Sequence, residues 1–235
     1  MNRPISQPAA IDAVIFDVDG TLVDSVDAHA TSWAETFRHF GHPVDIAAVR
    51  SQIGKGGDQL IPVFVPPEVA DEQGEAMESF RADLFRRVWL PQVRGFADVP
   101  ALFRRIRADG RRIALASSAK QSEMTAYRRA AGIEGLVDVE ISSDDADRSK
   151  PHPDIFLAAL ERLELAPSRA VAVGDSPWDA LAAGQAGLST IGMLCGGFPR
   201  DTLTEAGCIA LYDSPGDLLR RYDGSPITGD PQRAE

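Results

Sequence analysis

Two carboxylates stand directly behind an apolar run near the start of the chain. The run AVIF at 13–16 leads into Asp17 and Asp19, within the stretch FDVDGTLVDS at 16–25. If this segment is extended, alternation sends the side chains of Asp17 and Asp19 to the same face. An unpaired charge removed from water is costly, so two neighbouring carboxylates behind a buried strand indicate a bound cation.

Further reactive side chains stand at the ends of other apolar runs. Ser117 and Ser118 follow one run, Asp175 follows another with Asp179 one helical turn later, and Lys150 precedes a predicted helix. In an open α/β sheet, ligands bind beyond the carboxyl ends of the strands. We therefore expect these side chains to converge with the first two carboxylates.

The convergence predicts a magnesium site that also holds phosphate. Asp17, Asp19 and Asp175 offer hard oxygen ligands to one Mg²⁺, which keeps waters and a substrate phosphate in its octahedron. Lys150 offsets the remaining charge, and Ser117 with backbone N–H groups suits phosphate oxygens. Ser117 could instead cap the helix that begins near Lys120, so which of Ser117 and Ser118 contacts phosphate stays open.

The elements that must position these residues alternate along the chain. Short apolar runs predict strands covered on both faces, at 13–17, 113–117, 136–141, 169–174 and 189–194. Amphipathic patterns between them predict helices at 98–109, 153–163 and 177–186. This alternation predicts an α/β fold with a doubly wound, Rossmann-like parallel sheet.

One segment interrupts the alternation. Residues 27–90 contain no convincing strand, and helical patterns cover 26–40 and 68–89. We predict a helical cap domain at 27–90, inserted into an α/β core domain made of residues 1–26 and 91–235. The first nine and the last fourteen residues are rich in Pro, Gly and polar side chains, which predicts frayed tails.

Composition limits the partners and the compartment. The chain has 235 residues and a formal net charge of −11, which argues against nucleic-acid or anionic-membrane surfaces. The two cysteines lack metal-ligand spacing and are interpreted as free thiols of a reducing compartment. No signal-like segment or long apolar stretch occurs, so we expect a cytoplasmic protein that is a monomer or homodimer and acts on a small metabolite.

The chain resembles the haloacid dehalogenase superfamily of hydrolases, in the group with a helical (type C1) cap that includes phosphoglycolate phosphatases and β-phosphoglucomutases. Four separated motifs occur in the family's order, over about residues 11–195. They are DVDGT at 17–21, which includes Gly20 and Thr21, LASS at 115–118, SKPHPDIF at 149–156 and VGDSPWDA at 173–180.

The resemblance implies a role for each motif residue. Asp17 would be the nucleophile that forms an aspartyl-phosphate, and Asp19 would protonate the leaving oxygen and then activate water. The metal would bind the Asp17 and Asp175 carboxylates and the backbone carbonyl of Asp19. Lys150 and Ser117 would neutralise and hold the phosphoryl group, and Asp179 would support its own helix and Ser176 rather than bind the ion.

Two residues of the predicted cap have open interpretations. His29, with Trp33 on the same helical face, occupies the place where sugar-phosphate phosphatases and β-phosphoglucomutases often carry His and Trp, but it could equally be a half-exposed helical histidine. The loop IGKGGDQL at 53–60 places Lys55 toward the mouth of the site, where it would bind an anion or simply form a turn.

The resemblance therefore implies a Mg²⁺-dependent phosphatase of a small phosphorylated metabolite, such as a sugar phosphate or phosphoglycolate. A phosphomutase is the alternative, although the mutase arginine of the cap loop has no counterpart and Gly174 replaces the second acidic residue of those enzymes. A silent member that binds a metabolite or protein is the third interpretation. The second Asp of the first motif argues against dehalogenase and phosphonatase chemistry.

Overall fold

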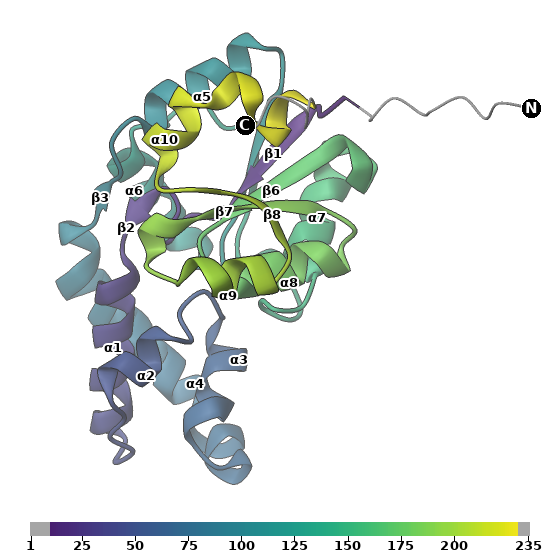
Figure 1. Ribbon diagram of the computed structural model, residues 1–235. Helices are drawn as coiled ribbons and strands as arrows, with labels where there is room; N and C mark the ends of the chain where they lie inside the picture. The colour runs from purple at the N-terminus through teal and green to yellow at the C-terminus, as the bar shows by residue number, and fades with distance from the viewer. Residues whose placement is uncertain (1–9, 230–235) are drawn as a thin grey trace, which may run out of the picture.

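A parallel sheet of six strands runs through the centre of the molecule, in the order β5-β4-β1-β6-β7-β8. Residues 10–229 are described by the structure, a computed structural model (Figure 1). The strands span Ala13–Phe16 (β1), Arg112–Ala116 (β4), Val139–Ile141 (β5), Ala170–Gly174 (β6), Ser189–Met193 (β7) and Cys208–Tyr212 (β8). β1 lies between β4 and β6, so the strand order changes direction beside it. The predicted α/β fold with a parallel sheet is confirmed.

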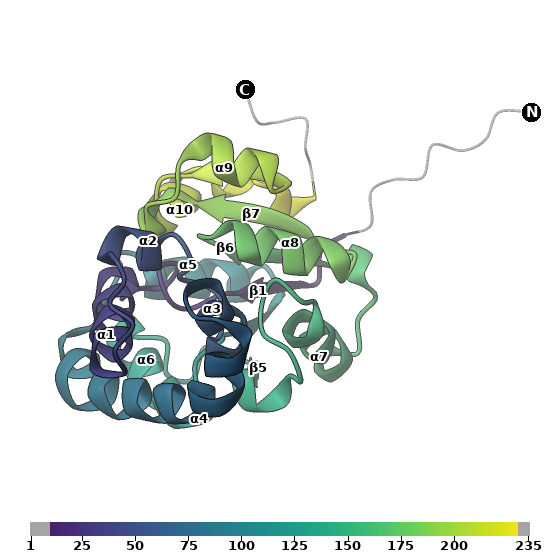
Figure 2. The same ribbon diagram turned by 90° about the horizontal axis from the view of Figure 1, so that it is seen from below.

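The sheet is covered on both faces, as its apolar strands require (Figure 2). Helices α5 (Val99–Ala108), α6 (Gln121–Ala131) and α10 (Pro215–Arg220) contribute to the core on one face. Helices α7 (Asp154–Leu163) and α8 (Pro177–Gln185) cover the other, and α9 (Arg200–Glu205) lies beside α8 and β8. The three helices predicted between strands are thus confirmed to within one or two residues.

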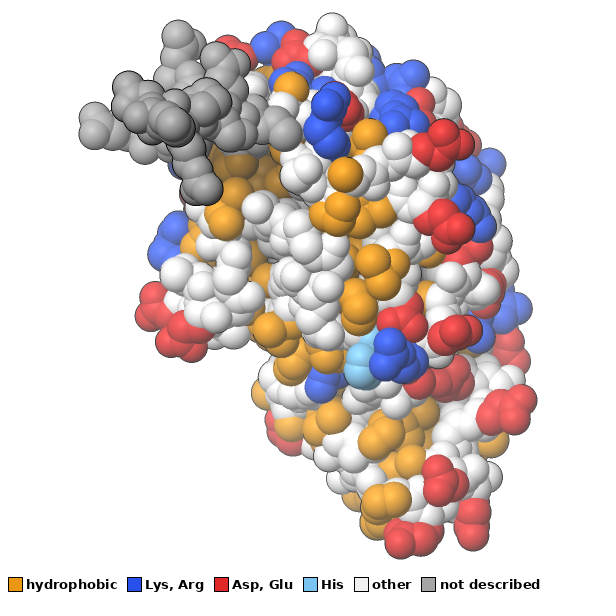
Figure 3. All heavy atoms as spheres, turned by 90° about the vertical axis from the view of Figure 1, so that its right-hand side faces the viewer, with side chains coloured by type: hydrophobic (Ala, Val, Ile, Leu, Met, Phe, Trp, Pro, Cys, Tyr) orange, Lys and Arg blue, Asp and Glu red, His pale blue; other side chains and the backbone are white. Residues whose placement is uncertain are grey.

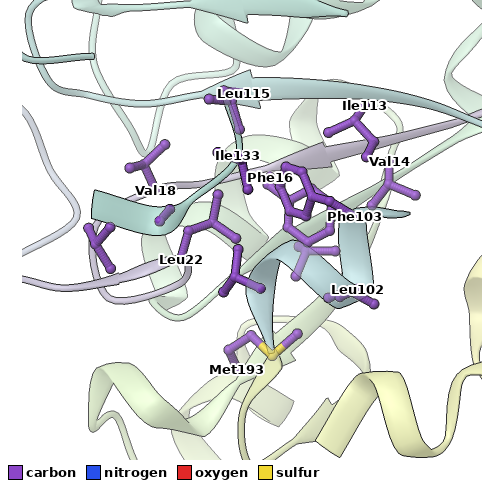
Figure 4. Packing of buried hydrophobic residues seen from close by; sticks show 14 of the residues in the cluster. Val14, Phe16, Val18, Leu22, Leu102, Phe103, Ile113, Leu115, Ile133 and Met193 are labelled. Carbon is purple, nitrogen blue, oxygen red and sulfur yellow. The ribbon is translucent and has the colours of Figure 1, made fainter. Parts of the chain in front are cut away.

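Alternation along β1 divides the core into two layers. Val14 and Phe16 point to one face, and the Phe16 ring packs against Phe103 of α5 at 4.9 Å between centroids (Figure 4). Ala13 and Ile15 point to the other face, where alanines of β4 and β6 let α7 and α8 approach closely. Because β1 is fully buried on both faces, the turn that follows it is fixed from two sides.

Two predictions about the sheet were incomplete. β5 begins at Val139, later than predicted, because the Asp138 carboxylate accepts a hydrogen bond from Ile113 N at 2.8 Å and pairs with Arg107. β8 was not predicted, although its sequence CIALY is apolar throughout; in the structure these residues are mostly only partly buried. Both are edge strands of the sheet, where burial constrains sequence least.

A helical module lies beside the carboxyl ends of the strands (Figure 1). It contains α1 (Val26–His39), α2 (Ile46–Arg50), α3 (Gly57–Phe64) and α4 (Pro67–Leu84), which continues as a π-helical turn (Phe85–Trp89) and a 3₁₀ turn (Leu90–Gln92). Trp33, Phe37, Leu60 and Met77 belong to its own apolar core. The chain enters and leaves through the antiparallel pair β2 (Val23–Asp24) and β3 (Arg94–Gly95). None of the helices in residues 10–229 has the length and apolar character needed to cross a membrane.

The predicted C-terminal tail at 222–235 is wrong for residues 222–229, the part of it that the structure describes. Residues Tyr222–Gly224 and Pro226–Thr228 form 3₁₀ turns, and the side chains of Tyr222 and Ile227 are buried in the core beside α5 and α10. The Pro and Gly residues there make turns that return the chain to the core rather than release it. Residues 1–9, the other predicted tail, lie outside the described residues.

We predict that Ile227→Ala lowers the free energy of unfolding by about 2–5 kcal/mol, because it leaves a cavity at a fully buried position. The matched control is Leu157→Ala, at a side chain that is 48% exposed on α7, which should change stability by less than about 0.5 kcal/mol. Urea denaturation of both variants checks this. Equal midpoints for Ile227→Ala and the parent protein would show that the C-terminal segment does not belong to the core.

Candidate active site

The turn after β1 places the first carboxylates. Asp17 N donates to the Val173 carbonyl of β6 at 2.8 Å, so the strand register continues through this residue. The next residues form a tight loop in which Leu22 N and Val23 N both donate to Val18 O. Gly20 adopts φ +82°, and a Cβ there would lie 2.3 Å from an Asp175 oxygen, so only glycine fits.

Three carboxylates, two behind strands and one in the first turn of α8, cluster together, and two of them pair with one lysine. Side-chain oxygens of Asp17, Asp175 and Asp179 lie within 4.8 Å of one another, and all three residues are buried. Lys150 Nζ, fully buried, lies 2.6 Å from Asp17 Oδ1 and 2.7 Å from Asp179 Oδ1. It also donates to the Ala116 carbonyl at the end of β4, at 3.0 Å. The predicted convergence at the carboxyl ends of β1, β4 and β6 is therefore present.

The charges in this cluster do not balance. Burial raises the pKa of Asp17 to about 7, with Asp179 and Asp19 also raising it and Lys150 lowering it. Burial and the charges of Asp17 and Asp179 raise the pKa of Asp175 well above its ordinary value. One ammonium cannot neutralise three buried carboxylates, so the donor set fits a further cation that prefers oxygen ligands.

The three carboxylates are not equally available to such an ion. Asp179 Oδ2 accepts hydrogen bonds from Ser176 N at 3.1 Å and from Ser176 Oγ at 2.6 Å, and its other oxygen pairs with Lys150. Thr21 Oγ1 donates to Asp175 Oδ1 at 2.9 Å, which leaves Oδ2 packed beside Gly20 and Gly196. Asp17 and Asp175 are therefore the better candidates, and Asp179 supports Lys150 and the start of α8.

The Asp19 side chain turns away from that cluster. Its Oδ1 accepts hydrogen bonds from Ser25 Oγ at 2.6 Å and from His29 Nε2 at 2.8 Å. Burial alone would raise the pKa of Asp19, but His29, Ser25 and Tyr127 together lower it to about 2. The carboxylate is therefore ionised and separate from the three converging carboxylates.

His29 connects the helical module to this carboxylate. It is 4% exposed and stacks on Phe85 at 4.1 Å between centroids, so it is not the half-exposed histidine that one interpretation allowed. Its Nδ1 contacts the Arg81 guanidinium, and its Nε2 lies 3.1 Å from the Tyr127 hydroxyl. Trp33 lines the same cavity, one helical turn further along α1.

The two adjacent serines have different environments. Ser117 is fully buried, and its Oγ accepts a hydrogen bond from Ala119 N at 3.1 Å. Ser118 is half-buried, donates to the Gly54 carbonyl at 3.3 Å, and lines the cavity beside Asp17 and Asp19. Ser118 is thus the serine that faces the cavity.

A cavity lies between the helical module and the strand ends. A small chamber of about 40 Å³ adjoins Asp17 and Asp19, and a larger one of about 200 Å³ lies farther out. Lys55 lines both chambers, and its Nζ lies 2.7 Å from Gln52 Oε1 and 4.0 Å from the centroid of the Trp178 ring. The loop at 53–60 thus reaches the cavity, and Lys55 contacts the ring of Trp178 on α8.

Three residues near the site were not singled out from the sequence. Arg81 lies on α4, Tyr127 on α6 and Ser25 before α1, and all three contact His29 or Asp19. Nothing in their spacing marks them, because each contact of Arg81 and Tyr127 joins helices that are far apart in the chain. Only the assembled fold brings them together.

Comparisons with known proteins agree with this geometry. Residues 11–187 match the family described as haloacid dehalogenase-like hydrolase. The chain is 32% identical to "Probable phosphatase IndB" of Dickeya dadantii over 92% of this chain and 97% of that one. It is 28% identical to "Phosphorylated carbohydrates phosphatase" of Thermotoga maritima, over 89% and 97%.

A solved structure has the same fold. The crystal structure of a hydrolase from Pseudomonas syringae superposes with a TM-score of 0.82 at 27% identity, and covers 90% of this chain and 97% of its own. The similarity extends over the helical module as well as the sheet. This chain belongs to the haloacid dehalogenase-like hydrolase family.

Proposed function

We propose that this enzyme, a phosphatase of its family, hydrolyses the phosphate monoester of a small metabolite through an aspartyl-phosphate on Asp17, with Mg²⁺ as its metal. The observation that carries the proposal is the Asp17 carboxylate, which is paired with buried Lys150 and opens on a cavity shared with Asp19. Sugar phosphates are the substrate class suggested by the name of the Thermotoga maritima relative, and phosphoglycolate by that of "Phosphoglycolate phosphatase" of Nitrosospira multiformis, which is 29% identical.

The residues divide the chemistry between them. Asp17 attacks phosphorus while the bond to the leaving oxygen breaks, and Lys150 neutralises charge beside the nucleophile. Ser118 or Ser117 and backbone N–H groups hold phosphoryl oxygens. Asp17 and Asp175, with the Asp19 carbonyl, would hold Mg²⁺, which supplies positive charge against the phosphoryl group.

Asp19 carries the protons in this proposal. Its carboxylate is ionised without substrate, so it is ready to accept the proton of the attacking water in the second step. In the first step it transfers a proton to the leaving alcohol. Monoester dianions acquire a proton near pH 6, so the substrate itself can bring that proton into the site.

We also propose that residues 27–90 act as a cap domain over a core made of residues 1–26 and 91–235. Ser118 Oγ donates to the Gly54 carbonyl, Ser149 N donates to Asp58 Oδ2 at 3.1 Å, and Arg50 donates to the Gly196 carbonyl at 3.2 Å. These contacts join residues 27–90 to the core. Opening would admit substrate, and closing would exclude water while Asp17 is phosphorylated.

The phosphatase is favoured over the mutase by a steric observation. A Cβ at Gly174 would lie 2.5 Å from the Asp179 side chain, so the acidic residue that mutases carry there does not fit this packing. His29 and Trp33 do line the cavity, which is the feature a mutase would use to retain an intermediate. The silent-binder interpretation leaves the buried pair of Asp17 and Lys150 unexplained.

We further propose that the protein is a cytoplasmic monomer or homodimer that binds neither nucleic acid nor membranes. On the face shown in Figure 3, acidic and basic side chains are interspersed over the core, and acidic ones predominate at the lower end formed by the cap. The described residues on this face form no continuous basic area of the kind that a polyanion requires.

A substrate panel tests the proposal. Phosphate monoesters assayed with Mg²⁺ should release inorganic phosphate, and EDTA should abolish the release because Asp17 and Asp175 would lose their counter-charge. Incubation with β-glucose 1-phosphate and a trace of bisphosphate tests the mutase, which would produce glucose 6-phosphate. Full activity in EDTA, or no release from any ester with metal present, would contradict the proposal.

Substitution of the two carboxylates of the first motif should have different effects. Asp17→Asn should abolish turnover because it removes the nucleophile, and folding should remain intact. Asp19→Asn should slow turnover by about 10²–10⁴-fold, the usual contribution of a positioned acid or base. Quenched-flow detection of labelled phospho-enzyme checks both, and a phospho-enzyme in Asp17→Asn would show that another residue is the nucleophile.

Asp175→Asn should separate metal binding from folding. The pKa values of Asp17 and Asp175 are raised in the folded state, so the folded state binds more protons than the unfolded state. As the pH rises from about 4 to about 7, the metal-free protein should therefore lose stability. Mg²⁺ at 100 times its Kd should raise the free energy of unfolding by about 2.7 kcal/mol.

The asparagine variant keeps an acceptor for Thr21 but removes a buried charge. Without metal at pH 8, its melting temperature should therefore exceed that of the parent protein, and Mg²⁺ should no longer raise it. Thermal unfolding at pH 5 and pH 8, with Mg²⁺ or EDTA, measures this. A parent-like response to Mg²⁺ in the variant would remove Asp175 from the metal site.

A further inference from the structure

The Arg81 guanidinium determines which nitrogen of His29 carries the proton. Arg81 extends from α4 of the cap, over the rings of Phe85 at 4.9 Å and Trp33 at 5.6 Å, and its Nη2 contacts His29 Nδ1. A guanidinium has only donors, so Nδ1 must accept. The ring proton therefore lies on Nε2, the nitrogen that faces Asp19 at 2.8 Å.

The Tyr127 hydroxyl completes the arrangement from the core side. Tyr127 is 1% exposed, and its hydroxyl lies 3.1 Å from His29 Nε2. Because Nε2 already carries a proton, the hydroxyl cannot donate to it, and its own hydrogen is available to the Asp19 carboxylate. Burial and the charge of Asp19 raise the pKa of Tyr127 well above its ordinary value, so it remains a donor.

We propose that Arg81 and Tyr127 are positioning residues, which act through His29 to hold the Asp19 carboxylate where it meets the leaving oxygen. The inference rests on the proposed function, in which Asp19 transfers the proton. Asp19 receives hydrogen bonds from Ser25 and His29, and the Tyr127 hydroxyl lies against His29 Nε2, so the three groups together fix the direction of the carboxylate.

Arg81 and Tyr127 come from different parts of the chain. Arg81 belongs to the cap helix α4, whereas Tyr127 belongs to α6 of the core. The arrangement around Asp19 is complete only while α4 lies against the core. Proton transfer to the leaving group is therefore aligned by the same closure that excludes water.

The first experiment uses the leaving group as the probe. An alkyl phosphate needs a proton on its leaving oxygen, whereas p-nitrophenyl phosphate needs little help, so lost positioning should affect only the alkyl ester. The measurement is the single-turnover rate at which the alcohol is released. Tyr127→Phe and Arg81→Met should lower this rate about tenfold or more for the alkyl ester, and less than about twofold for the p-nitrophenyl ester. Arg81→Lys, which keeps a donor toward Nδ1, should recover part of the alkyl rate.

The matched control is Tyr222→Phe. Tyr222 is equally buried, at 2% exposed, but its ring contacts Arg105 of α5 rather than the acidic site. This variant should leave both rates within about twofold. Equal losses on both esters in Tyr127→Phe and Arg81→Met would show a merely structural role and overturn the inference, as would parent-like rates on both.

The second experiment does not depend on turnover. Nitrogen NMR of the full chain, with the His29 signals identified by their loss in His29→Gln, should show a single tautomer protonated on Nε2. In Arg81→Met the ring should exchange between tautomers, and in Arg81→Lys the single tautomer should return. An unchanged tautomer in Arg81→Met would overturn the role of Arg81, whereas failure of the proposed function would appear separately, as an absence of alcohol release by the parent protein.

Discussion

The buried ammonium of Lys150 is the contact on which the rest of the site depends. It lies between Asp17 and Asp179 and also donates to the carbonyl at the end of β4, so one charge joins three segments of the sheet edge. A buried ion pair adds little net stability, because desolvation offsets the attraction, but loss of one partner costs about 3–5 kcal/mol. The surrounding fold must therefore hold all partners of Lys150 in place.

The need to hold these partners in place explains several local features of the backbone. Asp179 reaches Lys150 only because Ser176 holds its second oxygen and starts α8 with a reciprocal cap. The Asp179 side chain occupies the space that a side chain at position 174 would need, so this position is glycine. Gly20 and Gly196 likewise leave room for the Asp175 carboxylate. Each glycine is thus required by a carboxylate contact across the site rather than by its own turn alone.

The fold and the central site could be predicted from sequence for a physical reason. Strands buried on both faces must be apolar throughout, so β1, β4, β6 and β7 were recognisable, and the reactive residues behind them had to meet at one edge. β8 was missed although its run CIALY is equally apolar, and the buried turns around Ile227 lie among Pro, Gly and polar residues that give no periodic signal. Arg81 and Tyr127 escaped prediction because their contacts with His29 arise from helix packing, which leaves no periodic signal in the sequence.

Two carboxylates two residues apart end in opposite environments, and this difference defines the chemistry. Asp17 lies among other carboxylates, where burial raises its pKa to about 7. Asp19 lies among donors, and its pKa falls to about 2. Alternation alone would have sent both side chains to one place, but the tight loop through Gly20 directs Asp19 toward Ser25 and α1. Because His29 of the helical module is among the groups that lower this pKa, the module contributes to the proton affinity of Asp19.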